Sequence, residues 1–463
     1  MSPILCFLGR RRGTLLRSAS TSPPSSRLRL LLPRLAAVAT IAVGCLTSAQ
    51  AVDFGPFSLT GFAKAEVLRV SDLCPNNRCQ RDSLARKDFV WADELIQGST
   101  FGPASTTVSL FQPYLGANFD LGGGFRAKGM LSQRWRDGRE DFKGFLYDRS
   151  VGLEHENWGV LSVGAMTTRA WHMADFPFGT DVGLADAWAS SGSGYGLLTR
   201  AVRLTSRTFD LLEGDVVVEL THDRGERGWT QNKPRFTELW LHYGSRDLSI
   251  DMMFQNARNG TPSAFTHGPF TGPFYDSRFD SLMGSNGQGL AMVMARWRYT
   301  TRLEWMAGVR ANRWSGAYAH LLQPASANPE GFDVWNFPFN VDWSRDLGGG
   351  LYKGFSARST DMLAGARYLT GKWAISAAVL RLGSASTNNP MERGQSNTAT
   401  IMTAGASYEV MKGLRLQALA GRVSYGRLGL SPLSMPSNSA FTNIDSRLSR
   451  SGHWVGTAIV YTF

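Results

Sequence analysis

The sequence predicts an all-β protein: a transmembrane, antiparallel, up-and-down β-barrel of sixteen strands. Three observations predict this fold. Apolar and polar residues alternate in many segments, short and long connections alternate between those segments, and Gly, Trp, Phe and Tyr are frequent. Alternation with period two places successive side chains on opposite faces of a strand. Tight turns at one end, long loops at the other and an even number of strands are typical of outer-membrane barrels.

The alternation is clearest in the C-terminal segment "HWVGTAIVYTF". One face of the expected strand consists of Val455, Thr457, Ile459, Tyr461 and Phe463. Every backbone group must be paired in lipid, so the sheet has to close and this strand has to pair with the first, "PFSLTGFAKAEV". The aromatic end supplies an interfacial anchor, and Ile459, Tyr461 and Phe463 match the C-terminal signature that outer-membrane barrels share.

Sixteen segments show this alternation. We expect strands at 57–69, 105–119, 124–135, 145–156, 159–168, 199–209, 214–223, 235–244, 246–256, 288–299, 301–313, 359–369, 372–383, 398–409, 413–424 and 452–463. Short connections such as "NW", "GS" and "TGK" alternate with long, polar, Gly/Pro-rich ones, including 70–104, 258–287 and 425–451. A further long connection, 314–358, has room for two more strands, which would make eighteen.

Residues 1–51 have the composition of a secretory signal peptide. Seven arginines and no acidic residue precede the apolar run "LAAVATIAVGCL", and the A-x-A-like site Ala49-Gln50-Ala51 follows it. The apolar run is too short for a membrane-spanning helix, which needs about 20 residues. We therefore expect an exported protein whose barrel domain comprises residues 52–463.

Removal of this leader weakens the case for a nucleic-acid partner. The formal net charge of the whole chain is +12, and loss of the seven leader arginines lowers it to +5. The remaining sequence contains no cluster of Lys and Arg of the kind that binds nucleic acid. We expect no nucleic-acid partner.

The remaining cysteines, Cys74 and Cys79, lie close together in "LCPNNRCQ". An exported chain favours a disulfide, and the Pro75-Asn76-Asn77 turn brings the two sulfurs together. A metal pair is the alternative, but the sequence offers no third or fourth ligand nearby.

Catalytic motifs are missing. The sequence contains no G-x-S-x-G, P-loop, G-x-G-x-x-G or H-E-x-x-H motif, and its seven histidines are scattered. We expect no enzyme activity, no cofactor and no bound metal. A Ser-His pair formed in space, as in an outer-membrane phospholipase, is the catalytic alternative left open.

Four segments resemble Gram-negative general porins, especially those of β-proteobacteria. The runs "DLGGGFRAKGMLSQRW" and "DRSVGLEHENWGVLSVG" look like their second to fifth strands. The segments "SLTGFAKAEV" and "GTAIVYTF" are similar to their opening and closing strands. This resemblance implies an outer-membrane channel through which small hydrophilic solutes and ions diffuse passively. It also implies a homotrimer in contact with outer-membrane lipid and lipopolysaccharide, and insertion by the barrel-assembly machinery.

In that family, the loop after the fifth strand folds into the barrel and narrows it. The corresponding stretch here is 169–197, and its acids are Asp175, Asp181 and Asp186. Strand parity places four basic residues on the inner wall, namely Lys64, Arg126, Lys128 and Arg203. Loop acids facing wall bases would create a transverse field in the constriction. The family's arginine after the glycine that ends strand five is replaced by Ala165, with Arg169 as its possible substitute.

Other interpretations remain open. Inward charges can simply be solvated or paired across strands, which we expect for Arg296, Arg298, Arg310 and Arg415. A channel selective for anions or carboxylates is one alternative, because inward bases outnumber inward acids on this strand assignment. A surface-display barrel without transport is another, with the aromatic-rich loops 258–287 and 314–358 as its binding elements.

Overall fold

The computed structural model describes residues 52–70, 104–136, 139–140, 148–172, 197–224, 235–258, 287–315, 356–384, 386–387, 398–425 and 451–463. The chain divides into 1–46 and 47–463, and every described residue belongs to the second unit. The expected signal peptide, both cysteines of the expected disulfide and the three acids expected on the constriction loop therefore lie outside the described residues.

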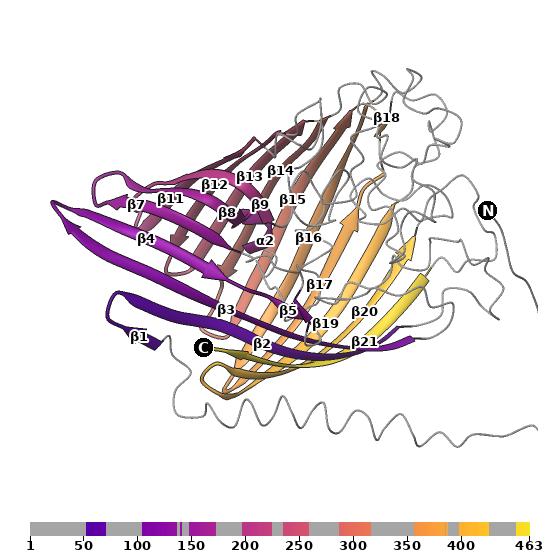
Figure 1. Ribbon diagram of the computed structural model, residues 1–463. Coiled ribbons are helices and arrows are strands. Elements are labelled where there is room, and N and C mark those ends of the chain that lie inside the picture. Colours follow the sequence, from indigo (N-terminus) through magenta and orange to yellow (C-terminus); the bar gives the residue numbers. More distant parts are fainter. Residues whose placement is uncertain are drawn as a thin grey trace, which may run out of the picture. The chain divides into compact units, whose positions relative to one another are not determined.

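The described elements are almost entirely strands (Figure 1). In chain order they are β1 (Val52–Phe54), β2 (Phe57–Val70), β3 (Ala104–Gly122), β4 (Phe125–Ser132), β5 (Trp135–Arg136), β6 (Arg139–Glu140), β7 (Arg149–His155), β8 (Gly159–Thr167), α2 (Arg169–His172), β9 (Leu197–Thr205), β10 (Phe209–Leu211), β11 (Gly214–Asp223), β12 (Arg235–Ser245), β13 (Leu248–Arg258), β14 (Gly287–Arg298), β15 (Leu303–Ser315), β16 (Ser356–Thr370), β17 (Trp373–Leu382), β18 (Ser386–Thr387), β19 (Ala399–Met411), β20 (Leu414–Tyr425) and β21 (Ser451–Thr462). No helix in this part of the chain is both long enough and apolar enough to cross a membrane.

Sixteen of these strands form a closed antiparallel ring, as predicted. The ring closes where β2 pairs with β21, from Phe62 opposite Thr462 to Val70 opposite Trp454. Closure satisfies the backbone groups that a sheet edge would leave exposed to lipid. β15 pairs directly with β16, so the ring formed by the described strands has sixteen members rather than eighteen.

The predicted strand at 199–209 is wrong in one respect, because it is split. β9 ends at Thr205 and β10 begins at Phe209, although both pair with β11. The Ser206 hydroxyl accepts a hydrogen bond from the backbone N–H of Val218 at 2.9 Å. Three residues of one strand thus lie opposite two of the other, which is a β-bulge.

Exposed apolar side chains face outward along the strands and alternate with buried side chains of mixed character that face inward. On β9, Val202 and Leu204 are 47% and 45% exposed, whereas Arg203 between them is buried. On β21, Val455 is exposed and Trp454 is buried. These observations confirm the predicted orientation of both strands, and they place the charged residues of interest on the inner wall.

The C-terminal residue fastens the closing strand to the first. Phe463 and Gly61 exchange two backbone hydrogen bonds of 2.8 and 2.9 Å. The Phe463 ring stacks on Tyr461 and Phe111, with centroids 5.8 and 6.2 Å away. A Cβ atom at Gly61 would lie 2.8 Å from Cζ of the Phe463 ring, so only glycine fits at position 61.

Candidate functional site: the inner wall of the barrel

Arg203 projects from β9 onto the inner wall, as strand parity predicted. Its Nε lies 3.0 Å from a Glu219 carboxylate oxygen and donates a 2.9 Å hydrogen bond to the Thr221 hydroxyl. Its Nη2 donates to the Thr167 carbonyl at 2.6 Å. These contacts come from β8 and β11, the strands on either side of β9. They hold the guanidinium group in one orientation.

Arg169 joins this group from α2, just after β8. Its guanidinium group forms a two-pronged ion pair with both Glu219 oxygens, the Nε distance being 2.7 Å. It also lies 4.5 Å from the centroid of the Trp240 ring, within cation–π range. Its backbone N–H donates to a Glu238 oxygen at 2.8 Å. The start of the stretch 169–197 is therefore bound to the inner faces of β11 and β12.

A register shift in β8 allows the chain to reach this position. The pairing of β8 with β9 shifts between Gly164 and Met166, and Gly164 has a φ of 136°. That conformation favours glycine, because other residues place a Cβ atom too close to the backbone. The porins that the sequence resembles commonly have an arginine directly after this glycine. Here Arg169 brings its guanidinium group to the same carboxylate as Arg203.

Three wall carboxylates complete the cluster, and sequence reasoning did not single them out. Glu219, Glu238 and Asp251 are all buried on the inner faces of β11, β12 and β13. Glu238 accepts a 2.7 Å hydrogen bond from Gln255, and Asp251 accepts one of 2.9 Å from the Trp240 indole N–H. Parity alone places each acid on the inner wall, but only the register between neighbouring strands brings them together.

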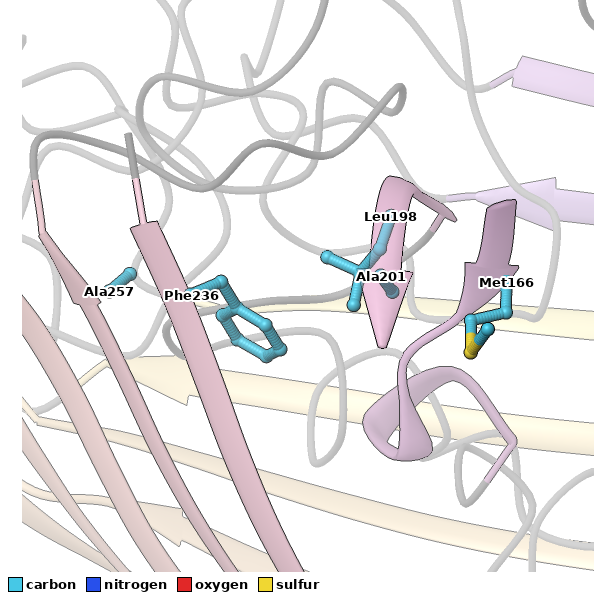
Figure 2. Close-up of a cluster of buried hydrophobic side chains, with 5 residues drawn as sticks. All are labelled: Met166, Leu198, Ala201, Phe236 and Ala257. Atoms are coloured by element: carbon cyan, nitrogen blue, oxygen red, sulfur yellow. The ribbon is translucent and has the colours of Figure 1, made fainter. Parts of the chain in front are cut away.

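A buried apolar cluster lies beside the charged one, toward the long connections. Figure 2 shows its five side chains, which come from β8, β9, β12 and β13. They are Met166, Leu198, Ala201, Phe236 and Ala257. Ala201 is two residues from Arg203, and Phe236 is two residues from Glu238, so each pair shares a strand face. Apolar neighbours lower the local dielectric and strengthen the ion pairs beside them.

The other predicted basic residues do not join this cluster and lie beside other carboxylates. Lys64 lies 3.1 Å from Glu66 on the same strand, and both are buried. Lys128 and Arg126 lie 3.0 and 3.7 Å from Glu154, and Arg126 is largely exposed. The predicted basic wall is thus three separate acid–base groups within the described residues.

A second buried network connects β15 and β16. Arg310 and Asp361 are both fully buried, with nitrogen–oxygen distances of 2.9 and 3.0 Å. Asn312 donates to the same carboxylate at 2.8 Å, and the Gly383 N–H donates to its other oxygen at 2.9 Å. This agrees with the interpretation of Arg310 as a base paired across strands. Asp361 thus joins Glu219, Glu238 and Asp251 as a buried acid of the inner wall.

A closed, sixteen-stranded antiparallel barrel with apolar residues outside and ion pairs on its inner wall defines the class of outer-membrane channel barrels. A family model for the Gram-negative porin matches residues 35–427. The chain belongs to the Gram-negative porin family, and this places it in the outer membrane.

Solved structures support the same fold. An anion-selective porin from Comamonas acidovorans is 11% identical with a TM-score of 0.54. A loop-deletion mutant of OmpT, an outer membrane protein of Vibrio cholerae, is 12% identical with a TM-score of 0.53. OmpF of Salmonella typhi, in complex with daunomycin, is 10% identical with a TM-score of 0.52. Each match covers 89% of this chain and 100% of the other. At these identities the likeness concerns the fold alone. No curated protein matches the sequence.

Proposed function

We propose that the protein is a porin through which small hydrophilic solutes and ions diffuse passively across the outer membrane. The observation that carries this proposal is the cluster of Arg203, Arg169, Glu219 and Glu238 on the inner wall. Fixed charges of both signs, held in place by hydrogen bonds, provide an electrostatic filter for polar solutes. No bond-making chemistry, cofactor or metal is part of the proposal, and the protein is not proposed to be an enzyme.

The constriction is proposed to arise from the stretch that Arg169 begins. In this proposal, Asp175, Asp181 and Asp186 extend from its anchored start toward the lumen. They would add negative charge beside the wall carboxylates Glu219 and Glu238. The four predicted wall bases, Lys64, Arg126, Lys128 and Arg203, would then contribute to the field from several sectors of the wall.

The mature protein is proposed to be a homotrimer of residues 52–463. A trimer form of OmpT from Vibrio cholerae, which is 12% identical with a TM-score of 0.51, supports this assembly. Removal of the signal peptide 1–51 and a Cys74–Cys79 disulfide belong to the same proposal. Insertion is assigned to the barrel-assembly machinery, which would recognise the terminal signature Ile459, Tyr461 and Phe463.

Single-channel conductance of refolded 52–463 in a planar bilayer tests the channel directly. We expect large steps that close in threes, and a reversal potential in a salt gradient reports the ion preference. Small conductance with saturable solute binding would favour the selective channel instead. If correctly folded protein gives no conductance steps, the channel proposal is wrong and a display barrel is favoured.

A further inference from the structure

His242 is the only inward-facing histidine on the described strands. It shares the inner face of β12 with Glu238 and Trp240, and its side chain is 32% exposed. The other histidines of these strands alternate with residues of the inner wall and therefore face outward: His155, His222 and His453. Histidine is the side chain whose charge ordinarily changes between about pH 5 and pH 8. His242 thus brings a chargeable group to the inner wall.

Asp251 on β13 holds both His242 and Trp240 through one carboxylate oxygen. His242 Nδ1 lies 3.0 Å from Asp251 Oδ1, and the Trp240 indole N–H donates to the same oxygen at 2.9 Å. Because an ionised carboxylate only accepts hydrogen bonds, Nδ1 carries the proton of neutral His242. Nε2 lies over Gly244, 2.9 Å from the position of an added Cβ atom. A second proton therefore binds at Nε2 and leaves the bond to Asp251 in place.

A stack of three side chains connects His242 to the start of the stretch 169–197. The His242 and Trp240 rings are nearly parallel, with centroids 5.6 Å apart and planes 21° apart. The Arg169 guanidinium carbon lies 4.5 Å from the Trp240 ring centroid. At most about 10 Å therefore separates the imidazole from this guanidinium group, close to the Debye length at 0.1 M salt. A charge on His242 thus acts on the cluster around Arg169.

The net charge of that cluster depends on His242. Its two bases are outnumbered by its three acids, which gives −1 while His242 is neutral and zero once His242 is protonated. The bases are Arg169 and Arg203, and the acids are Glu219, Glu238 and Asp251. Protonation of one residue therefore changes the sign balance of the wall at the proposed filter.

The charged groups that face His242 from the two adjoining strands are acidic. The inward residues nearest to it are Asp215, Val217 and Glu219 on β11, and Ser249, Asp251 and Met253 on β13. Beyond them, Asp210 on β10 lies opposite Asp215, and Arg296 on β14 lies opposite Ser249. A proton on His242 thus adds a positive charge to a sector in which acids lie nearest.

We propose that His242 is a specificity-determining residue of the channel, and that its protonation shifts the ion preference toward anions. A fixed positive charge on the wall raises the local concentration of anions and lowers that of cations. The direction follows from the chemistry, since acidification only adds positive charge at this position. The inference rests on the proposed function, because a preference exists only if the barrel conducts.

Reversal potentials of refolded 52–463 at pH 8 and pH 5, in a salt gradient of low mean concentration, test this proposal. The variant H242Q is neutral at both values, and H242K is positive at both. The matched control is H222Q, which replaces an outward-facing histidine on β11 whose Nδ1 lies 2.9 Å from the Thr237 hydroxyl. Heat-dependent mobility on a gel checks the folding of each variant, and single-channel steps confirm that each conducts.

We expect the cation-to-anion permeability ratio of the wild type to fall roughly two- to fivefold from pH 8 to pH 5. This is the effect of one unit charge roughly 4–10 Å from a passing ion in water. H222Q should respond like the wild type. H242Q should lose most of the response and keep the ratio found at pH 8, whereas H242K should have the lower ratio already at pH 8.

Three results would overturn this inference and leave the channel itself intact. They are an unchanged ratio in a conducting wild type, a full response in H242Q, and an equal loss of response in H222Q. If none of the folded proteins conducts, the proposed function is wrong and the inference is wrong with it.

Discussion

At the scale of single residues, the arginines of the inner wall are held by carboxylates on neighbouring strands. Arg203 and Arg169 share Glu219, and Arg310 has Asp361. Placing such charges in a protein interior costs several kcal/mol per ion, and the cost is offset only when geometry and hydrogen bonds are good. The two networks differ in their surroundings: the Arg310 pair is fully buried, whereas Arg169 is partly exposed. We therefore assign a stabilising role to the Arg310–Asp361 network and ion selection to the network of Arg169, Arg203 and Glu219.

The Arg310–Asp361 pair should affect stability and leave ion preference unchanged. Asp361→Ala leaves a buried guanidinium group without its partner, which costs about 3–5 kcal/mol. The double variant R310M/D361L replaces both charges with apolar groups and should recover most of that loss. Unfolding in urea measures the effect. If the double variant is as unstable as the single one, the pair has a role beyond charge compensation.

The selective network predicts shifts of opposite sign. Arg203→Gln removes a positive charge and should move the reversal potential toward cation preference, while Glu238→Gln should move it toward anion preference. Glu409→Gln, an exposed carboxylate on β19, is the matched control and should produce a smaller shift. Salt-gradient reversal potentials of the four proteins provide the measurement. Equal shifts in Glu238→Gln and the control would argue against a filter at this site.

At the scale of elements, period-two alternation was sufficient to predict every strand of the ring. It was insufficient at Ser206, where a side-chain hydrogen bond to the Val218 backbone adds a residue that alternation does not reveal. Parity also predicted that Arg203 faces inward. It did not predict that Glu219 and Glu238 meet Arg169, because that depends on the register among β9, β11 and β12 and on the shift after Gly164.

The close contact between Phe463 and Gly61 leads to a prediction for the closing strand. Gly61→Ala places a Cβ atom 2.8 Å from the Phe463 ring and 2.5 Å from the Gln112 carbonyl oxygen. The last strand cannot then pair with β2 as it does here, so refolding yield should fall severalfold. Gly129→Ala on β4 is the control, since its new Cβ atom has ordinary contacts from 3.6 Å. Heat-dependent gel mobility after refolding measures both, and equal yields would mean that closure tolerates a displaced C-terminus.

At the scale of the whole molecule, the inner wall and the outward face of the barrel carry different arrangements of charge. The inner wall pairs acids with bases, and the outward face carries exposed bases near the long connections within the described strands. Lipid excludes unpaired charge from the middle of the outer face, whereas water in the lumen accommodates both signs. Ion preference should therefore depend on the charges of the inner wall and not on those of the outward face.

This separation leads to a prediction about salt. If fixed wall charges select ions through their field, the preference should weaken as salt screens it, because the Debye length falls from about 10 Å at 0.1 M to about 3 Å at 1 M. Reversal potentials at a constant concentration ratio but increasing mean salt measure this directly, and the wild type should approach no preference at 1 M. A double variant of two exposed, outward-facing arginines on β15 and β16, R313Q/R358Q, should follow the same curve, since its lost charges face away from the lumen. A preference that persists unchanged at 1 M would point to ion binding at close contact or to a size filter, and the transverse-field mechanism would have to be abandoned.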